Sequence, residues 1–205
     1  MNKVSIIDSG TSNLFSIKNA IRKVGIDAKI TSKRSEINKS DILILPGVGS
    51  FKQAMHNLNK TKIIKPIKDH IISGKRFLGI CLGFQLLFER SSEFGNTKGL
   101  SVLKGSIELF DKKKVNSIPH VGWNRILEKK NHKYLKSNEF YYFVHSFYVK
   151  PKNKSIIYTT TSADKFNFCS SIIYKNIFGC QFHPEKSGKQ GLTFLKNFFN
   201  KLNVR

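Results

Sequence analysis

The sequence predicts an α/β fold in which helices cover both faces of a mostly parallel central sheet, with a smaller, mostly antiparallel β region in the middle of the chain. Three observations indicate this fold. Strand-like and helix-like segments alternate over roughly residues 1–90, as they do in parallel sheets. Residues 42–45 are all apolar, which suits a strand buried on both faces. Residues 100–176 are rich in the β-branched and aromatic residues that favour antiparallel strands.

The first half of the chain supplies the alternating elements. Its first helix has apolar residues at intervals of three or four, and a glycine ends it. These residues are Leu14, Ile17, Ile21 and Val24, followed by Gly25. The other expected elements are strands at residues 4–7, 28–30 and 42–45 and helices at residues 51–58 and 63–73. A further strand begins at Phe77 and continues as an apolar helix to Phe88.

The second half begins with the β region and returns to the α/β pattern at its end. Residues 141–144 and 155–160 are strand-like runs, and residues 177–182 form the last expected strand. The final helix has an apolar face that comprises Leu192, Leu195, Phe198, Phe199 and Leu202. Without an internal repeat or a linker, residues 1–205 are predicted to form a single domain.

The chain has a formal net charge of +23, which raises the question of nucleic-acid binding. However, 17 of the 36 basic residues lie in residues 1–100, so the charge is spread rather than gathered into one tail or helix. There is also no RNA-recognition or helix-turn-helix motif. We therefore expect no nucleic-acid partner, and interpret the charge as favouring solubility or an acidic protein partner.

The three cysteines are Cys81, Cys169 and Cys180. This odd and sparse set argues for a reducing cytoplasm rather than a disulfide framework, and no pair has zinc-ligand spacing. We expect no metal and no cofactor. No apolar run reaches about 18 residues, so no membrane span is expected, and the N-terminal residues lack the features of a secretory signal.

Residues 79–83, Gly-Ile-Cys-Leu-Gly, fit a sharp strand-to-helix turn that presents a nucleophile. The glycines avoid crowding in such a turn, and a helix N-terminus favours a thiolate on Cys81. The backbone N–H of Leu82 is a natural donor to an oxyanion. An isolated cysteine is more often a buried thiol, but the flanking glycines favour the interpretation of Cys81 as a nucleophile.

A thiol nucleophile needs an imidazole to take up and return a proton. Three of the six histidines are expected to face solvent: His56, His70 and His132. His183 directly follows the strand at residues 177–182, and the carboxyl ends of parallel strands line one crevice, so His183 can meet Cys81. Glu185, two residues further along and stiffened by Pro184, is placed to accept the far imidazole N–H. The sequence thus predicts a triad of Cys81, His183 and Glu185.

Assembled in this way, the chain resembles the class I (triad) glutamine amidotransferases, which makes the expected fold flavodoxin-like. The resemblance covers essentially the whole chain, with motifs at residues 46–49 (Pro-Gly-Val-Gly), 79–87 and 181–188. More narrowly, it is similar to the glutaminase subunits of imidazole glycerol phosphate synthase, from histidine biosynthesis. That similarity is carried by residues 119–124 (Pro-His-Val-Gly-Trp-Asn), by residues 143–146, and by Asp8 with Asn13 and Leu14.

The resemblance implies that Cys81 attacks glutamine and forms a thioester, that His183 is the general acid and base, and that Glu185 orients it. It further implies that oxyanion and glutamine contacts come from residues around this triad. These are Gly47, Val48, Gly49, Leu82, Gln85, His145 and Ser146. For His145 and Ser146 the implied contacts are made by the backbone, and a peptide flip at residues 47–49 would accompany activation.

A partner is also implied: a cyclase subunit with a (β/α)8-barrel fold, which would form a heterodimer and use the ammonia to make imidazole glycerol phosphate and AICAR. In this family the free glutaminase is nearly silent until the partner binds. The residues implied to face the partner are Asn13, Trp123, Asn124 and Tyr142. Taken alone, a single tryptophan such as Trp123 is more often a core residue, and Tyr142 could simply pack within a strand.

Some positions depart from the family's pattern without touching the triad. The first loop, residues 9–12 (Ser-Gly-Thr-Ser), lacks the usual Tyr and a further Gly. Elsewhere, Phe84 and Val121 each replace a usual Met, and Phe147 replaces a usual Tyr. The loop leaves open a paralogous subunit that feeds ammonia to a synthase modifying surface-polysaccharide sugars. A cysteine hydrolase or peptidase, which Gln85 and residues 46–49 disfavour, and a basic nucleic-acid-binding protein are the other hypotheses.

Overall fold

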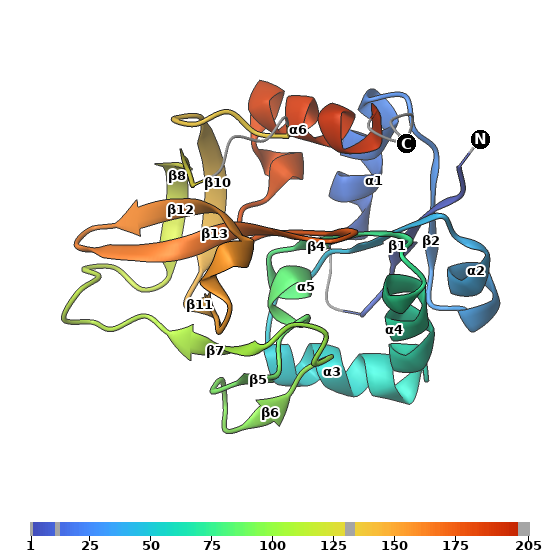
Figure 1. Cartoon of the computed structure of the whole chain (residues 1–205), viewed down its shortest axis with the longest axis horizontal. Coiled ribbons are helices and arrows are strands. Elements are labelled where there is room, and N and C mark those ends of the chain that lie inside the picture. Colours follow the sequence, from blue (N-terminus) through green and yellow to red (C-terminus); the bar gives the residue numbers. More distant parts are fainter. Residues whose placement is uncertain (1, 11–12, 130–133, 201–205) are drawn as a thin grey trace.

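A long central sheet runs through the computed structural model, which describes residues 2–10, 13–129 and 134–200. Within these residues the sheet has the strand order β2-β1-β3-β4-β14-β13-β11-β7-β5-β6, with β12 beside β13 and β9 beside β12 (Figure 1). A second, two-stranded sheet consists of β8 and β10. The fold is therefore the α/β arrangement that the sequence predicts.

The parallel part of the sheet is built from five short strands. They are β1 (Val4–Ile7), β2 (Ala28–Thr31), β3 (Ile42–Leu45), β4 (Arg76–Ile80) and β14 (Ile177–Cys180), and each pairs in parallel with its neighbour. The helices around it are α1 (Leu14–Lys23), α2 (Arg34–Lys39), α3 (Phe51–Lys60), α4 (Ile64–Ile72) and α6 (Gly188–Asn200). Figure 1 shows α1 and α6 on one face of the sheet and α3 and α4 on the other.

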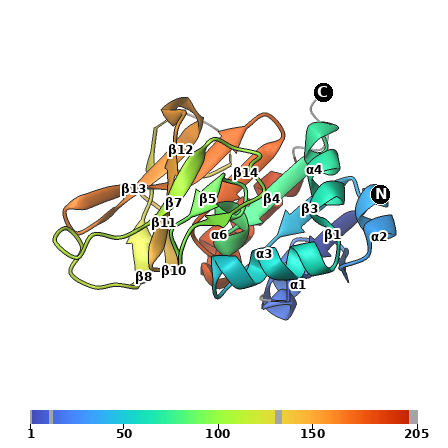
Figure 2. The same ribbon diagram turned by 90° about the horizontal axis from the view of Figure 1, so that it is seen from below.

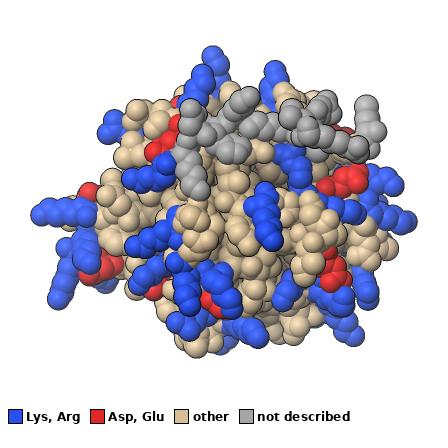
Figure 3. Space-filling model, viewed as in Figure 1, with Lys and Arg blue, Asp and Glu red and all other residues tan. Residues whose placement is uncertain are grey.

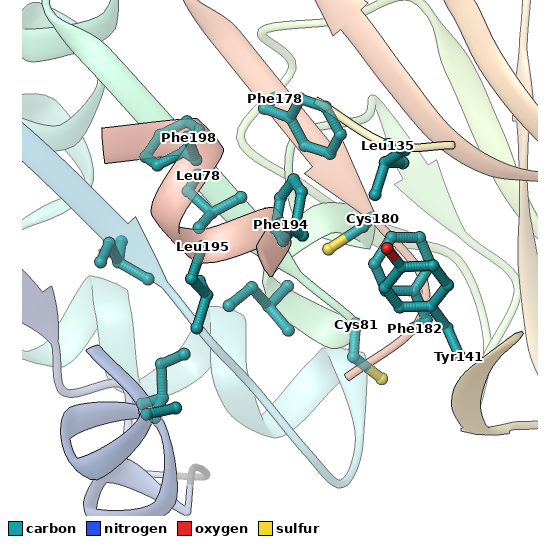
Figure 4. Close-up of a cluster of buried hydrophobic side chains, with 14 of the residues drawn as sticks. Leu78, Cys81, Leu135, Tyr141, Phe178, Cys180, Phe182, Phe194, Leu195 and Phe198 are labelled. Carbon is teal, nitrogen blue, oxygen red and sulfur yellow. The ribbon is translucent and has the colours of Figure 1, made fainter. Parts of the chain in front are cut away.

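Because both faces are covered, successive side chains of one strand enter two different cores. On β1, Ile6 packs in the core under α1 and α6, whereas Ile7 packs in the core with α3 and α4. On β3, Ile44 belongs to the first core and Leu43 to the second. Figure 4 shows part of the first core, where Phe194 and Leu195 of α6 approach Leu78 of the sheet. The fully apolar run at residues 42–45 is explained by this burial on both faces.

The antiparallel part extends the sheet beyond β14 and carries the small sheet beside it (Figure 2). Its longer strands are β7 (Gly105–Leu109), β11 (Phe147–Pro151), β12 (Ile157–Ala163) and β13 (Phe166–Tyr174), with β8 (His120–Arg125) and β10 (Phe140–His145) in the small sheet. The short elements are β5 (Arg90–Ser91), β6 (Thr97–Lys98), β9 (Leu127–Glu128), α5 (Leu82–Gln85) and the 3-10 turns η1 (Lys154–Ile156) and η2 (Pro184–Lys186).

The structure corrects several local predictions. Helix α2 was not expected, because Ile37 is its one buried residue and a single apolar position gives no periodicity. Strand β14 ends at Cys180 rather than at residue 182. His70 is buried, not solvated: its Nε2 lies 3.0 Å from the Arg76 carbonyl oxygen, and burial lowers the pKa of His70. His56 is exposed as predicted, while His132 and Leu202 lie outside the described residues.

Surface charge is spread over the face of the molecule that Figure 3 shows. Lys and Arg side chains are distributed across the visible face in Figure 3, with Asp and Glu among them. This distribution agrees with the even spread along the sequence. In the described part of the chain, no helix combines the length and the apolar character needed to cross a membrane.

Candidate active site

Cys81 occupies the turn between β4 and α5 in a strained backbone conformation. Its φ is 53° and its ψ is −111°, a region that residues other than glycine seldom adopt. Such a conformation costs about 1–3 kcal/mol and persists only where its surroundings enforce it. Here the Cys81 N–H donates to the Cys180 carbonyl (2.8 Å), and the Cys81 carbonyl accepts from the Gln85 N–H (3.1 Å). The predicted sharp strand-to-helix turn is therefore present at Cys81.

Two glycines make the turn sterically possible. A Cβ atom on Gly83 would lie 1.7 Å from the Leu45 carbonyl oxygen, so the turn packs directly on the end of β3. A Cβ atom on Gly79 would lie 2.9 Å from the Cα of Phe84. Helix α5, however, spans only four residues instead of the longer apolar helix that was expected. The dipole of a long helix is therefore not available to stabilise a thiolate on Cys81.

His183 and Glu185 form a buried pair beyond the end of β14. The Nδ1 of His183 lies 2.7 Å from Oε1 of Glu185, and the two side chains are 2% and 7% exposed. Backbone contacts with β10 hold the pair, because the His183 N–H donates to the Tyr142 carbonyl (2.9 Å). The Ser187 hydroxyl adds a second link, donating to the His183 carbonyl (2.6 Å) and accepting from the Tyr142 N–H (3.0 Å).

The charge on His183 follows from its neighbours. Burial alone would lower the pKa of His183, but the negative charge of Cys81, helped by Glu185, raises it to about 10. At neutral pH the imidazole of His183 is therefore protonated. Its Nε2 atom is buried and makes no hydrogen bond of ordinary geometry to any described residue, which leaves that proton available for transfer. The structure thus brings the predicted triad together.

A cavity of about 540 Å³ opens in front of Cys81, a size that suits a small ligand. It is lined by predicted residues, namely Asn13, Val48, Gly49, Leu82, Gln85, His145 and Ser146, and by Glu93, Pro119, Val144, Phe147 and Lys186. A larger cavity of about 650 Å³, which includes Lys3 and Ser5, lies at the amino ends of the strands and contains no cysteine. Ligands of open parallel sheets bind at the carboxyl ends, so the cavity at Cys81 is the candidate active site.

Gln85 is buried in the cavity wall rather than extended into it. Its Nε2 donates to the Phe147 carbonyl and to Oε1 of Gln181, both at 3.0 Å. Gln181 in turn directs its Nε2 toward Sγ of Cys81 at 3.6 Å. The side chain of His145 also turns inward, and its Nδ1 lies 2.8 Å from the Phe147 oxygen, so the backbone is what residue 145 can offer a ligand.

The predicted oxyanion donor is occupied by the protein itself. The Leu82 N–H donates to the Gly47 carbonyl at 3.3 Å. Gly47 is buried and does not line the cavity, whereas Val48 and Gly49 are exposed beside it, and Gly49 has a φ of +86°. In this conformation Leu82 has no free N–H for a substrate oxygen.

The residues predicted to face a partner differ in their placement. Trp123 is 52% exposed, so the expectation for a lone tryptophan in the core is wrong here. Its ring meets Tyr142 edge-to-face at 6.2 Å, and the ammonium of Lys186 lies 5.7 Å from the Tyr142 ring. Exposed Asn13 caps α1 by accepting from the Ser16 N–H (3.3 Å). Asn124 instead turns its amide inward, toward His120 and the Ser162 carbonyl.

The sequence analysis missed Glu93, which lines the cavity and accepts a hydrogen bond from the Phe51 N–H at 2.5 Å. Glu93 belongs to an irregular loop with no periodic pattern, so the sequence offered no signal for its position.

The altered first loop and metal binding complete the account of the predicted site. In that loop, Thr11 and Ser12 lie outside the described residues, and Ser9 is buried. Among the residues that the structure describes, no cluster of three His, Cys, Asp or Glu side chains could hold a metal ion.

The fold, with a cysteine on a strained turn in this cavity, suits an amidotransferase, and comparisons with known proteins agree. Residues 5–202 match the family model described as Glutamine amidotransferase class-I, so the chain belongs to the class I glutamine amidotransferases. Two solved structures share the fold at low identity: PurLQS from Thermotoga maritima (TM-score 0.78, 18% identity, covering 99% of this chain and 100% of that chain) and a glutamine amidotransferase (TM-score 0.77, 15%, covering 98% and 99%).

Curated relatives share a narrower name. The chain is 50% identical over 198 residues to imidazole glycerol phosphate synthase subunit HisH of Caldanaerobacter subterraneus subsp. tengcongensis, covering 95% of this chain and 96% of that protein. It is 44% identical over 200 residues to the subunit of the same name from Aquifex aeolicus, covering 96% and 95%.

Proposed function

We propose that the chain, acting as one unit over residues 1–205, is the glutaminase subunit of an imidazole glycerol phosphate synthase. It hydrolyses L-glutamine to glutamate and ammonia, and the ammonia passes to a cyclase subunit for histidine biosynthesis in the cytoplasm. The observation that carries the chemistry is the strained Cys81, which lines the cavity, together with a buried, protonated His183 that Glu185 holds. The near full-length identity to the relatives supports the pathway.

The proposed reaction needs two additions to the amide carbon. The Cys81 thiolate attacks the side-chain carbonyl of glutamine, and the bond to nitrogen breaks as Nε2 of His183 donates its proton to the leaving amine. Ammonia leaves and a thioester remains. His183, now neutral, takes a proton from water as the hydroxyl attacks the thioester, which releases glutamate and restores the thiolate. Glu185 accepts from Nδ1 throughout, fixing the tautomer and stabilising each imidazolium.

The oxyanion of each tetrahedral intermediate requires a change at residues 47–49. Leu82 can donate to it only after the Gly47 carbonyl withdraws from its N–H. Rotation of the Gly47–Val48 peptide would remove that carbonyl and turn the Val48 N–H toward Cys81. Glycine suits this position, since a Cβ on Gly47 would lie 2.9 Å from the Leu82 Cβ. The described conformation is therefore an inactive one.

Glutamine recognition would divide between charged and polar groups of the cavity wall. Glu93 is the carboxylate available to the α-ammonium group. Both amide hydrogens of Gln85 are committed to protein acceptors, so Gln85 has its Oε1 to offer. The backbone at His145 and Ser146 would meet the α-carboxylate.

The proposed partner is a cyclase with a (β/α)8-barrel fold that covers the cavity mouth. Val48, Val121 and Trp123 are exposed apolar residues on this side of the molecule, at the cavity or on strand β8 next to it. Covering them would shield ammonia from water, where it is protonated at neutral pH and no longer nucleophilic. The rival paralogue hypothesis rests on the first loop, and no feature of its described residues favours it.

A reconstituted complex tests the proposal. The chain would be purified with the histidine-pathway cyclase, and glutamate formation measured with and without the cyclase and its nucleotide substrate. We expect strong stimulation by the cyclase, loss of activity in Cys81→Ala, and full activity in Cys169→Ala, whose thiol is buried away from the cavity. Stimulated activity that survives Cys81→Ala would refute the mechanism, and stimulation only by a different synthase would refute the pathway.

A further inference from the structure

Two imidazoles that the reaction does not use, buried His145 and half-buried His120, lie behind the cavity. His120 on β8 and His145 on β10 face each other across the small sheet, with Nδ1 of His120 3.1 Å from Nε2 of His145. Rings of Phe110, Phe143 and Phe168 surround them; His145, for example, lies 5.1 Å from Phe168 and His120 5.2 Å from Phe143, centroid to centroid. This contact between two imidazoles in an aromatic environment needs an explanation.

The contact between His145 and the Phe147 carbonyl determines which ring nitrogens carry hydrogen. The Phe147 carbonyl can only accept, so Nδ1 of His145, 2.8 Å away, carries a hydrogen. In a neutral ring, Nε2 of His145 is then an acceptor. Nδ1 of His120 must therefore donate to it, which leaves Nε2 of His120 as an acceptor in turn.

The contact at the other end agrees with this assignment. The side-chain nitrogen of Asn124 lies 3.0 Å from Nε2 of His120 and 2.8 Å from the Ser162 carbonyl, which can only accept. Its side-chain oxygen accepts from the Arg125 N–H at 2.7 Å. Both ends of the Asn124 amide are thus fixed, and its NH₂ group faces His120. Every hydrogen between Asn124 and Phe147 has one permitted place.

The chain of hydrogen bonds continues to the nucleophile. The Phe147 oxygen that accepts from His145 also accepts from Gln85 (3.0 Å), which donates to Gln181 (3.0 Å). Gln181 directs its amide at Sγ of Cys81 (3.6 Å). At the other end, strand β8 presents Trp123 to solvent and the next residue, Asn124, to the interior, because side chains alternate along a strand.

The charge state of both rings supports the same picture. Burial lowers the pKa of His120, which the Asp164 carboxylate only partly offsets. Burial also lowers the pKa of His145 to about 3; the Phe147 carbonyl opposes this effect, while His120 and His183 add to it. An extra proton on either ring would place two N–H groups face to face. Both imidazoles are therefore neutral, and the hydrogen bonds from Asn124 through His120 and His145 to the Phe147 carbonyl all point in one direction.

We propose that His120 and His145 are positioning residues: they form a one-directional hydrogen-bond relay from Asn124, beside the exposed Trp123, to the Phe147 carbonyl, and so set Gln85 and residues 145–147 in the glutamine pocket. This inference rests on the proposed glutaminase function. It assigns the rings no contact with the reacting atoms. Their effect is on the placement of the pocket wall.

Three substitutions in the reconstituted complex separate a relay from simple packing. His120→Phe keeps an aromatic ring among the phenylalanines but removes both hydrogen bonds. His120→Asn loses the ring but keeps a donor at the position of Nδ1. Asn124→Asp keeps the shape but removes the donor, which forces His120 to reverse or gain a proton. The exposed Asn59 on α3 provides the matched control, Asn59→Asp.

The relay predicts an order of effects opposite to that of packing. We expect His120→Phe and Asn124→Asp to raise KM for glutamine about tenfold with kcat changed by less than about threefold, the size of one misplaced hydrogen-bonding group. His120→Asn should recover most of the affinity. Packing alone would make His120→Phe near normal and His120→Asn the weaker variant, and that order would overturn the proposal.

A spectroscopic measurement gives a result that does not depend on activity. Two-bond ¹H–¹⁵N correlation spectra report which ring nitrogen carries hydrogen. Both histidines should be neutral with hydrogen on Nδ1 at pH 7, and His120 should lose that form in Asn124→Asp. A charged ring, or hydrogen on Nε2 in the unsubstituted protein, would refute the relay. Absence of glutamine hydrolysis in the complex would instead refute the proposed function and leave the tautomers as they are.

Discussion

Two buried histidines beside the cavity, His183 paired with Glu185 and His145 paired with His120, reach opposite charge states in similar surroundings. Both His183 and His145 are almost entirely buried. Yet the pKa of His183 is raised to about 10, whereas that of His145 is lowered to about 3. Burial disfavours the charged imidazole in both places, so the difference must come from the partners.

Formal charge on the partner decides the outcome. His183 lies between Cys81 and the Glu185 carboxylate, both of which raise its pKa, whereas His145 has a neutral carbonyl and a neutral imidazole as partners. One site can therefore release and recover a proton during a reaction, and the other keeps its hydrogens fixed. Under the proposed function, catalysis falls to His183 and positioning to His145 with His120, two groups of the same residue type.

The largest expected effect comes from removing the charge that acts on His183. Cys81→Ala should lower glutamate formation by the complex at least about 10³-fold, because the nucleophile is lost. It should also lower the pKa of His183, followed by NMR titration of its imidazole. The pKa of His145 should stay low, since its causes remain. A His183 pKa that does not fall in this variant would contradict the comparison.

The next effect concerns the orientation of the same ring. In Glu185→Gln the side-chain amide can donate to Nδ1, which favours the wrong tautomer of His183 and removes a negative charge. We expect kcat of the complex to fall about 10²-fold, with the protein still folded. Steady-state kinetics and circular dichroism would measure both. Unchanged kcat would mean that Glu185 does not orient the base.

The pH dependence of stability should show the two groups with opposite signs. The folded protein holds more protons than the unfolded chain on His183 between its ordinary pKa of 6.5 and about 10, so its contribution is full below pH 6.5 and is lost as pH rises through about 10. For His145 the contribution is full above pH 6.5 and is lost as pH falls toward about 3.

Denaturant unfolding as a function of pH checks this prediction. His183→Gln should flatten the loss of stability between pH 6.5 and 10, and His145→Gln should reduce the loss between pH 6.5 and 3. Each variant should leave the other limb in place. If both variants altered the same limb, the two histidines would not differ in the way described.

The smallest effect on stability and activity is expected from replacing a solvent-exposed carboxylate, that of Asp69. Asp69 pairs with Lys65 at 2.6 Å on the surface of α4, where both side chains are mostly exposed. Asp69→Asn should change the free energy of unfolding by less than about 0.5 kcal/mol and leave glutamate formation unchanged. It is the reference for Glu185→Gln, because both replace a carboxylate by an amide. A comparable loss of activity in both variants would point to general charge effects.

Features that depend on residues close together in the sequence were predicted correctly. The turn around Cys81 and the His183–Glu185 pair depend on neighbouring residues, so spacing and motif sufficed to place them. Helix α2 was missed because a single apolar residue, Ile37, carries no period. The inward turn of Asn124 and its contact with His120 could not be foreseen, since they depend on the register between β8 and β10.

Contacts between distant segments explain the remaining differences. Whether the Gly47 carbonyl meets the Leu82 N–H depends on how two loops pack, which a single sequence does not state. His70 was expected in solvent because it is polar and helical, yet it lies on the face of α4 that packs on the molecule. Trp123 shows the converse, because its exposure reflects a surface that has no partner within its own chain.

The close approach of Gly83 to the Leu45 carbonyl also limits how this protein can vary. No side chain other than hydrogen fits there, because even a methyl group would overlap the oxygen at 1.7 Å. In a library that randomises position 83 and selects for growth without histidine, glycine codons alone should survive. At position 95 a Cβ atom would meet open space and only the backbone, with a φ of +106°, opposes a side chain, so substitutions there should be less damaging than at position 83 in the same selection. The position of the Leu45 carbonyl thus limits which residues can occur at position 83 during evolution.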